Sequence, residues 1–176
     1  PRLLPKHSAH CACPGGAAEL GMTGTAIAQG LETARLSAMR LQIQQVTPYV
    51  IINDAYNANP ASTKAALEVL AGYPCKGKRV AVLGNMLELG EEAERGHRSV
   101  GQVVVSRGID VLYTLGDLAG WIGQEALECG MAPQAIRTAG SCEEISASLR
   151  ELLQPGDVLL VKGSRGMKME EIINQL

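Results

Sequence analysis

The sequence contains no phenylalanine, and its aromatic residues are one tryptophan and four tyrosines among 176 residues. It also has no apolar stretch near the roughly 18 residues that a membrane-spanning helix requires. The opening residues, PRLLPKH, lack the apolar segment of a secretory signal peptide. We therefore expect a cytoplasmic protein with no membrane partner.

Neither sign of charge dominates the chain. Its 16 lysines and arginines and 18 aspartates and glutamates give a formal net charge of -2. Domains that bind nucleic acid usually carry a clear basic excess on one face, so we expect no nucleic-acid partner. A small soluble ligand is the better expectation, and we expect the protein to be a monomer.

The five cysteines are an odd number, which favours reduced thiols over a disulfide framework. Three of them stand far apart in segments that we assign to core or loop: Cys75, Cys129 and Cys142. Cys11 and Cys13 lie near His7 and His10, but a Cys-x-Cys pair without a second pair of ligands is poor spacing for tetrahedral zinc. We therefore expect no metal site in this chain.

Short runs of valine, isoleucine and leucine alternate with segments of helical period from Val50 onward, which is typical of βαβ units and a parallel sheet. The runs predict strands over residues 49–53, 79–84, 110–115, 135–138 and 157–162. Apolar residues at helical spacing predict helices over residues 60–71 and 143–153. Because the strands are almost continuously apolar, we expect helices on both faces of the sheet. The predicted fold is therefore α/β, a doubly wound, Rossmann-like domain with a mostly parallel sheet.

The first 37 residues differ from the rest, with Ala- and Gly-rich helical stretches and no predicted strand. We interpret residues 1–37 as the helical tail of a preceding domain and residues 38–176 as the α/β domain. Alternation of apolar and polar residues from Leu41 to Ile43 predicts a short edge strand near the boundary. The chain also lacks an initiator methionine, so we expect it to be part of a longer protein.

The segment NDAYNANP, Asn53 to Pro60, is the strongest candidate for a binding site. It lies directly after a predicted parallel strand and before a helix, and ligands of doubly wound sheets bind beyond the carboxyl ends of the strands. Asn59 and Pro60 suit the N-cap and first turn of that helix. Asp54 is placed to accept hydrogen bonds from ribose hydroxyls. Alternatively the polar residues serve only a turn and a cap, although four of them with Tyr56 exceed what one cap needs.

The last predicted strand runs into KGSRG, which places Lys162, Ser164 and Arg165 at a turn before a helix. Two cations and a hydroxyl at such a turn can bind a carboxylate or a phosphate. A flexible basic turn is the alternative. The segment from Gly72 to Lys78 has the glycine spacing of a P-loop, but it precedes a strand and Arg79 replaces the Ser or Thr that holds magnesium, so we interpret it as a connection.

The second strand is followed by LGNMLELGEE, Leu83 to Glu92, and then by His97. His97 shares a helical stripe with Val100 and Val104. A single histidine on such a stripe is more often packed and hydrogen-bonded than catalytic.

These motifs resemble those of the Mur ligase family, the ATP-dependent amide ligases that build the peptide of bacterial cell wall. DAYNANP, LGNMLELGEE and KGSR are similar to the motifs of the branch that adds D-alanyl-D-alanine. Other branches carry DYAHTP, and folylpolyglutamate synthases DGAHNP, at the first motif, so Tyr56 to Asn59 distinguishes the chain. It departs from the family at Asn85, where aspartate is usual, and at Cys11, where an asparagine contacts adenine.

The resemblance implies roles for individual residues. Arg40, which precedes Asp54 by 14 residues, matches the arginine at the hinge into the last domain of these ligases, which reaches the nucleotide phosphates. It is expected to be catalytic, together with Lys162. The residues expected to bind ATP are Arg40, Asp54, Tyr56, Asn57 and Asn59, with Asp54 on the ribose. The residues expected to bind the amino substrate are Glu88, Ser164 and Arg165.

The resemblance also implies the reaction. ATP phosphorylates the carboxylate of UDP-N-acetylmuramoyl-tripeptide, and the amine of D-alanyl-D-alanine attacks the acyl phosphate to form an amide. The P-loop and the magnesium ligands belong to the central domain of the family, so we expect the chain alone to be inactive. Two alternatives stay open: a noncatalytic Rossmann-like module that binds a nucleotide, and a sister ligase or folylpolyglutamate synthase with another amino substrate.

Overall fold

The computed structural model describes Thr23 and residues 39–176 of the chain. Its strands are β1 Gln42–Val46, β2 Tyr49–Asp54, β3 Arg79–Gly84, β4 Val111–Leu115, β5 Ile136–Ala139 and β6 Val158–Lys162. Its α-helices are α3 Pro60–Gly72, α4 Ala93–Ser106, α5 Gly120–Glu128, α6 Cys142–Leu152 and α7 Glu170–Asn174, and its 3-10 helices are η1 Gly90–Glu92, η2 Pro133–Ala135 and η3 Arg165–Met167. The predicted domain tail over residues 1–37, with His7, His10, Cys11 and Cys13, lies outside the described residues apart from Thr23.

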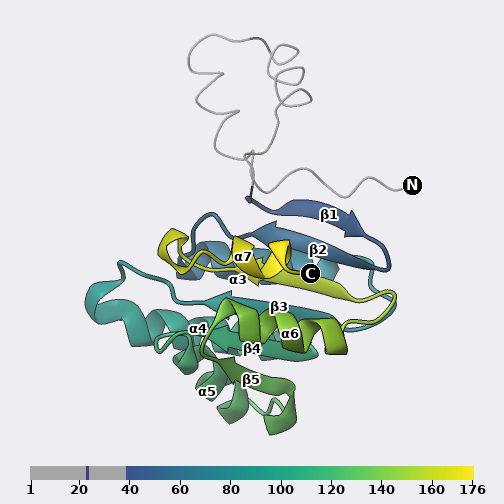
Figure 1. The fold of residues 1–176 in the computed structure, drawn as a ribbon. Coiled ribbons are helices and arrows are strands. Elements are labelled where there is room, and N and C mark those ends of the chain that lie inside the picture. Colours follow the sequence, from purple (N-terminus) through teal and green to yellow (C-terminus); the bar gives the residue numbers. More distant parts are fainter. Residues whose placement is uncertain (1–22, 24–38) are drawn as a thin grey trace. The chain divides into compact units, whose positions relative to one another are not determined.

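The strands form a six-stranded sheet in the order β1-β2-β6-β3-β4-β5 (Figure 1). Strands β2, β6, β3, β4 and β5 are parallel, and β1 pairs antiparallel with β2 at one edge. All five predicted parallel strands are confirmed to within one residue at each end. The predicted edge strand also exists, but it runs farther than Leu41 to Ile43 because the pairing with β2 continues to Val46.

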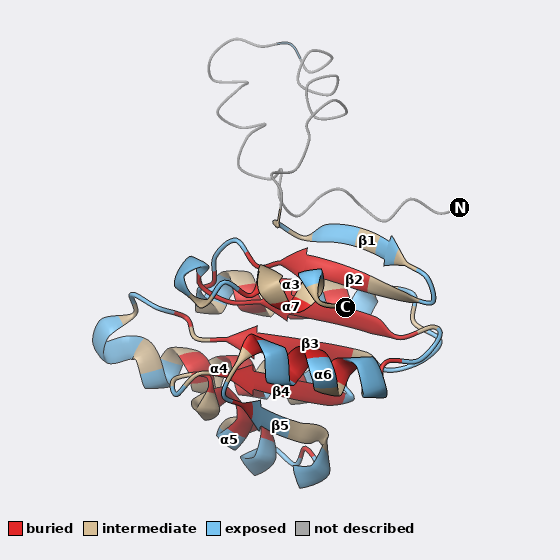
Figure 2. Cartoon of the chain, in the orientation of Figure 1, coloured by how far each residue is buried: buried red, intermediate tan, exposed pale blue. Residues whose placement is uncertain are grey.

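Successive residues of each parallel strand point to opposite faces of the sheet, and helices cover both faces. In β2, Ile52 joins the core beneath α3, α4 and α5, whereas Ile51 joins the core beneath α6 and α7. The central strands β6, β3 and β4 are buried apart from Arg79 at the start of β3, while β1 is largely exposed (Figure 2). The doubly wound, Rossmann-like α/β fold is therefore confirmed.

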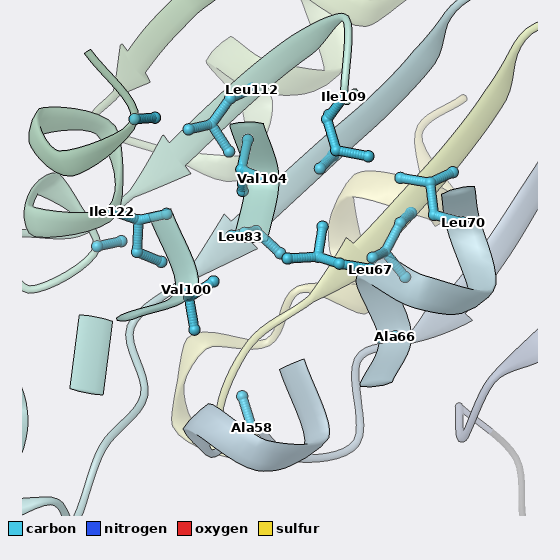
Figure 3. Close-up of a cluster of buried hydrophobic side chains, with 14 of the residues drawn as sticks. Ala58, Ala66, Leu67, Leu70, Leu83, Val100, Val104, Ile109, Leu112 and Ile122 are labelled. Carbon is cyan, nitrogen blue, oxygen red and sulfur yellow. The ribbon is translucent and has the colours of Figure 1, made fainter. Parts of the chain in front are cut away.

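The core beneath α3, α4 and α5 is the larger of the two (Figure 3). Leu67 of α3, Val104 of α4 and Ile122 of α5 contribute fully buried side chains and surround strand residues such as Leu83 and Leu112. Burial of one such side chain contributes roughly 1.5–3 kcal/mol to folding. This core fixes the positions of the three helices relative to the sheet.

Close contact between α4 and α5 depends on a glycine. A Cβ atom on Gly101 would lie 2.5 Å from the carbonyl oxygen of Ile122 and 3.1 Å from the backbone nitrogen of Ala126. Both neighbours are backbone atoms of α5, which cannot turn aside as a flexible side chain would. Only a residue without a side chain fits between the two helices at this point.

The Gly72 to Lys78 segment is a connection between α3 and β3, as the sequence predicts. It is fixed by the buried Asp157, whose Oδ1 accepts a hydrogen bond from the Lys78 backbone N–H at 2.7 Å and whose Oδ2 accepts one from the Gln154 N–H at 2.8 Å. Asp157 lies beside the amino end of β6. This anchor is therefore at the amino ends of the strands, whereas the predicted site is at their carboxyl ends. Within the part of the chain that is described, no helix is long and apolar enough to cross a membrane.

Candidate functional site

Asp54 and Lys162 lie opposite each other at the carboxyl ends of the adjacent strands β2 and β6. The Lys162 Nζ donates a hydrogen bond to Asp54 Oδ2 at 2.5 Å, and the two side chains are 2% and 11% exposed. The same ammonium group donates to the carbonyl oxygen of Asn57 at 2.9 Å. A buried charge is tolerated only when it is paired and hydrogen-bonded. Lys162 and Asp54 provide this pairing and hydrogen bond to each other.

The other oxygen of Asp54 holds the segment that precedes β1. Asp54 Oδ1 accepts a hydrogen bond from the backbone N–H of Leu41 at 2.9 Å, and the backbone N–H of Tyr56 donates to the carbonyl oxygen of Met39 at 3.1 Å. Residues 39–41, which we call the 39–41 segment, are thus fixed on both sides of Arg40. The Asp54 carboxylate, predicted to accept from ribose hydroxyls, already accepts one protein hydrogen bond on each oxygen.

Arg40 is exposed, and its guanidinium carbon lies 4.5 Å from the centroid of the Tyr56 ring. This is a cation–π distance, and the ring itself is 42% exposed. Stacking holds the exposed guanidinium in one region. The pair therefore presents a positioned positive charge beside the end of β2, where an anionic ligand can reach it.

Asn57 and Asn59 have different positions in the same loop. Asn57 is exposed, and its Oδ1 accepts from the neighbouring Ala58 N–H at 2.9 Å. Asn59 is the N-cap of α3: its side chain accepts from the Ser62 N–H at 2.8 Å, and the Ser62 hydroxyl accepts from the Asn59 N–H at 3.1 Å. This capping box and the proline at the start of the helix are as predicted, and the Asn59 side chain is committed to the helix.

Ser164 joins the loops that follow β2 and β3. Its side chain is buried, and its hydroxyl accepts a hydrogen bond from the Leu87 N–H at 2.8 Å and donates to the Ala58 carbonyl at 3.3 Å. Its backbone N–H donates to the Asn85 carbonyl at 3.0 Å. Ser164, predicted to bind the amino substrate, is thus part of the scaffold beneath the loops.

The loop after β3 is also held from below by His97. The fully buried imidazole accepts a hydrogen bond from the Met86 N–H at Nε2, at 2.9 Å, and its Nδ1 lies 2.6 Å from the Ala93 carbonyl oxygen. Nδ1 must carry the proton because the carbonyl can only accept. Burial lowers the pKa of His97, although the hydrogen bond to Ala93 opposes the shift. His97 is the packed, hydrogen-bonded histidine that its helical stripe predicts.

Asn85, where the resemblance noted from the sequence leads us to expect aspartate, is a structural residue here. Its Oδ1 accepts from the Ala119 N–H at 2.8 Å, one residue before α5 begins. Its side chain packs so closely on Gly116 that a Cβ atom there would lie 2.5 Å from Asn85 Nδ2. The Ala119 N–H requires only an oxygen acceptor, and the uncharged Asn85 amide supplies one.

Glu88 and Arg165 are exposed at the rim of these loops. Arg165 Nη1 donates to Glu170 Oε1 at 2.7 Å and lies 3.9 Å from the sulfur of Met39, so it borders the 39–41 segment. Glu88 has a positive φ of 66°. The structure thus brings together Arg40, Asp54, Tyr56, Asn57 and Lys162, while Glu88 stands on the separate loop after β3.

Positive φ angles at non-glycine residues are concentrated at the carboxyl ends of the parallel strands. The described non-glycine residues with positive φ are Met39 at 60°, Leu41 at 45°, Glu88 at 66° and Lys168 at 48°. All four lie in the 39–41 segment or in the loops after β3 and β6. Such conformations cost on the order of 1–3 kcal/mol each and cluster at functional sites. The rest of the domain must therefore hold these segments in place.

A groove of about 800 Å³ lies beyond the carboxyl ends of β4 and β5. Its lining includes Asp117, Ser141, Cys142, Glu143 and Gly166. Burial, and then the nearby acidic side chains, raise the pKa of the Cys142 thiol, so it is not an activated nucleophile. No sequence motif points to these residues, although Asp117 and Ser141 follow predicted strands, and ligands of such sheets bind beyond the carboxyl ends of the strands.

The described residues include donors suited to an anion. Arg40 supplies an exposed, positioned cation, and Tyr56 and Asn57 supply exposed polar groups beside it. These donors suit the phosphate and sugar of a nucleotide. Among residues 39–176 and Thr23, no group of three or more His, Cys, Asp or Glu side chains is placed to hold a metal ion.

Comparison with protein families matches residues 39–165 to the Mur ligase, glutamate ligase domain. The chain is 36% identical over 99% of its length to the UDP-N-acetylmuramoyl-tripeptide--D-alanyl-D-alanine ligase of Bacillus subtilis (strain 168). It is 35% identical over 89% of its length to the ligase of the same name from Escherichia coli (strain K12). The chain covers 38% and 33% of these relatives, so it spans about a third of their length.

Solved structures agree with the sequence comparison. MurF from Acinetobacter baumannii superposes with a TM-score of 0.81 at 30% identity, covering 94% of this chain and 35% of that one. MurF ligase from Thermotoga maritima, solved in complex with ADP, superposes with a TM-score of 0.73 at 26% identity, covering 92% of this chain and 35% of that one. Since the matching family domain extends over most of the sequence, the chain belongs to the Mur ligase family.

Proposed function

We propose that this chain is the C-terminal part of an ATP-dependent amide ligase of peptidoglycan precursor synthesis, which adds D-alanyl-D-alanine to UDP-N-acetylmuramoyl-tripeptide. The relatives named for this reaction support the proposal, together with the Tyr56 to Asn59 motif. ATP activates the tripeptide carboxylate as an acyl phosphate, and the dipeptide amine displaces phosphate. The P-loop and the magnesium ligands are assigned to the central domain of the complete ligase.

Within this reaction, the chain supplies contacts to nucleotide and dipeptide. Arg40 meets the nucleotide phosphates, and Tyr56 and Asn57 border the sugar. Asp54 remains the candidate for the ribose through the lone pairs that its two protein hydrogen bonds leave free. Glu88 and Arg165 border the dipeptide. Asn59 and Ser164 act through the loops that they hold.

The observation that carries the proposal is the exposed Arg40 guanidinium stacked on Tyr56 at the carboxyl end of β2. Arg98 and Arg137 also stack on aromatic rings, but Arg40 is the one that lies at the carboxyl end of β2, between two backbone hydrogen bonds to that strand end. A guanidinium in this position can fork onto phosphate oxygens and neutralise charge during phosphoryl transfer.

Titration of the chain with ATP tests the binding part of the proposal. Arg40→Ala should weaken ATP binding about tenfold or more, because a charge-assisted hydrogen bond contributes roughly 1.5–3 kcal/mol. Arg107→Ala is the matched control, since Arg107 is a half-exposed arginine paired with Glu68 on the helical face. Equal affinities of the Arg40 and Arg107 variants would reject the phosphate role.

A coupling assay separates the ligase from a binding module and from a sister ligase. The longer polypeptide that contains this domain should form product from ATP, UDP-N-acetylmuramoyl-tripeptide and D-alanyl-D-alanine. A panel that replaces the dipeptide with single amino acids should give much less product. ATP binding without any coupling would favour the noncatalytic module, and turnover with another amino compound would favour a sister ligase.

A further inference from the structure

Two of the described cations near the end of β2, Lys162 and Arg40, differ in access. Lys162 has a side chain that is 2% exposed, and its ammonium donates to Asp54 and to the Asn57 carbonyl. Arg40 is exposed above the Tyr56 ring. A phosphate can approach the guanidinium, whereas it would have to open a buried ion pair to approach the ammonium.

The buried pair is connected to the exposed cation through the backbone. Lys162 pairs with one oxygen of Asp54, and the other oxygen accepts from the Leu41 N–H at 2.9 Å. On the other side of Arg40, the Met39 carbonyl accepts from the Tyr56 N–H at 3.1 Å. Arg40 is thus held between two hydrogen bonds to residues at the end of β2.

The 39–41 segment needs this support. Met39 and Leu41 both have positive φ, at 60° and 45°, and neither is a glycine. Side chains with a Cβ atom disfavour this region, so an unsupported segment would relax to negative φ and redirect Arg40. The hydrogen bond from Leu41 to Asp54 opposes that relaxation directly.

We propose that Lys162 and Asp54 form a positioning pair: Lys162 orients the Asp54 carboxylate, Asp54 fixes the 39–41 segment, and that segment presents Arg40 to the nucleotide phosphates. Lys162 is then a positioning residue rather than a catalytic residue. The last step rests on the proposed function, since it needs Arg40 to meet a nucleotide. The first two steps concern the domain alone.

Backbone amide exchange, measured by NMR on the chain without ligand, tests the first two steps. Lys162→Met leaves the buried carboxylate without its cation, so Asp54 should turn toward water and release Leu41. The Leu41 amide should then exchange about tenfold faster or more relative to the Val82 amide in β3, which reports on the stability of the whole domain.

Asp157→Asn is the matched control. Asp157 is also a buried aspartate that accepts hydrogen bonds from backbone N–H groups, but it lies at the amino ends of the strands, away from Asp54. Its substitution should leave the Leu41 to Val82 exchange ratio unchanged. The proposal is overturned if Lys162→Met leaves that ratio unchanged too, or if Asp157→Asn raises it equally.

A double-mutant cycle with ATP tests the last step. If Lys162 acts only by placing Arg40, Lys162→Met and Arg40→Ala should each weaken ATP binding, and the double variant should bind only about as weakly as Arg40→Ala. If the ammonium touches the phosphates itself, the two losses should multiply, which would overturn the positioning role. If the unsubstituted chain binds no ATP while the exchange result holds, the proposed function fails and the support of the 39–41 segment by the pair stands.

Discussion

The imidazole of His97 accepts a hydrogen bond from the backbone N–H of Met86 at 2.9 Å, which connects helix α4 to the loop after β3. That loop carries Glu88, and its Leu87 N–H is held from another direction by Ser164. Only the form with a free Nε2 lone pair can accept the Met86 bond. The shape of the loop is therefore tied to the protonation state of a buried histidine.

The free energy of unfolding should decrease as the pH is lowered through the range where an ordinary histidine titrates. Because the pKa of His97 is lowered in the folded protein, the unfolded chain binds a proton first as pH drops below about 6.5. The His97 contribution is fully present above that pH and is lost as the pH falls from 6.5 toward the folded-state pKa, with a slope of up to about 1.4 kcal/mol per pH unit. Urea denaturation between pH 7.5 and 5 measures it.

His97→Gln removes this titration and keeps a side-chain acceptor. Its unfolding free energy should depend less on pH than that of the unsubstituted chain, even though it is lower at pH 7.5. Parallel curves for the two proteins would mean that His97 protonates alike in the folded and unfolded states, contrary to its burial.

Ser164→Ala should destabilise the loops without disturbing the core. The substitution deprives the Leu87 N–H of its acceptor and the Ala58 carbonyl of a donor, and an unsatisfied buried group costs about 1–3 kcal/mol. Amide exchange should show the largest change at Leu87. Ser106→Ala, at an exposed serine that donates only to its own helix, should change stability by less than about 0.5 kcal/mol. Equal effects of the two substitutions would contradict the bridging role of Ser164.

Gly101→Ala should be costly, because its Cβ atom would overlap the Ile122 carbonyl oxygen of the facing helix. Overpacking of this kind typically costs about 1–3 kcal/mol. Gly120→Ala is the contrasting substitution: a Cβ atom there meets nothing within 4 Å, so it should be neutral or slightly stabilising. Chemical denaturation of both variants decides the matter, and a tolerated Gly101→Ala would mean that α4 and α5 are less closely packed than described.

Substitutions at Asn59 separate its capping role from a ligand role. Asn59→Ala should cost about 1 kcal/mol of stability, while Asn59→Ser, which retains an N-cap acceptor, should cost much less. If Asn59 acts only through α3, the serine variant should also bind ATP like the unsubstituted chain. A serine variant of normal stability with weak ATP binding would instead place the Asn59 amide on the nucleotide.

The central strands could be predicted because each contains an almost uninterrupted apolar run, as Val158 to Val161 illustrates. The position of the site could be predicted too, since parallel strands end at one edge and polar motifs follow them. What the sequence could not supply is strand order. Asp54 and Lys162 are 108 residues apart and meet only because β6 inserts between β2 and β3.

Because strand order cannot be predicted, the exposure of each site residue is harder to predict than its position at the strand ends. Arg40, Tyr56 and Asn57 are exposed as a binding role requires, but Asp54, Lys162 and Ser164 are buried in hydrogen bonds with neighbouring loops. A motif indicates which residue types gather at an edge of the sheet. Whether a side chain faces a ligand or another loop depends on partners from distant segments.

The far edge of the sheet has a consequence for how the domain behaves in concentrated solution. Strand β5 ends the sheet, so one side of its backbone is open to pairing with another polypeptide. The strand spans only Ile136–Ala139, and its exposed Arg137 is held over the Tyr113 ring, with the guanidinium carbon 5.5 Å from the centroid. A short strand with a fixed charge is a poor template for strand addition. Strand β5 should therefore resist the edge-to-edge strand pairing by which open sheets aggregate.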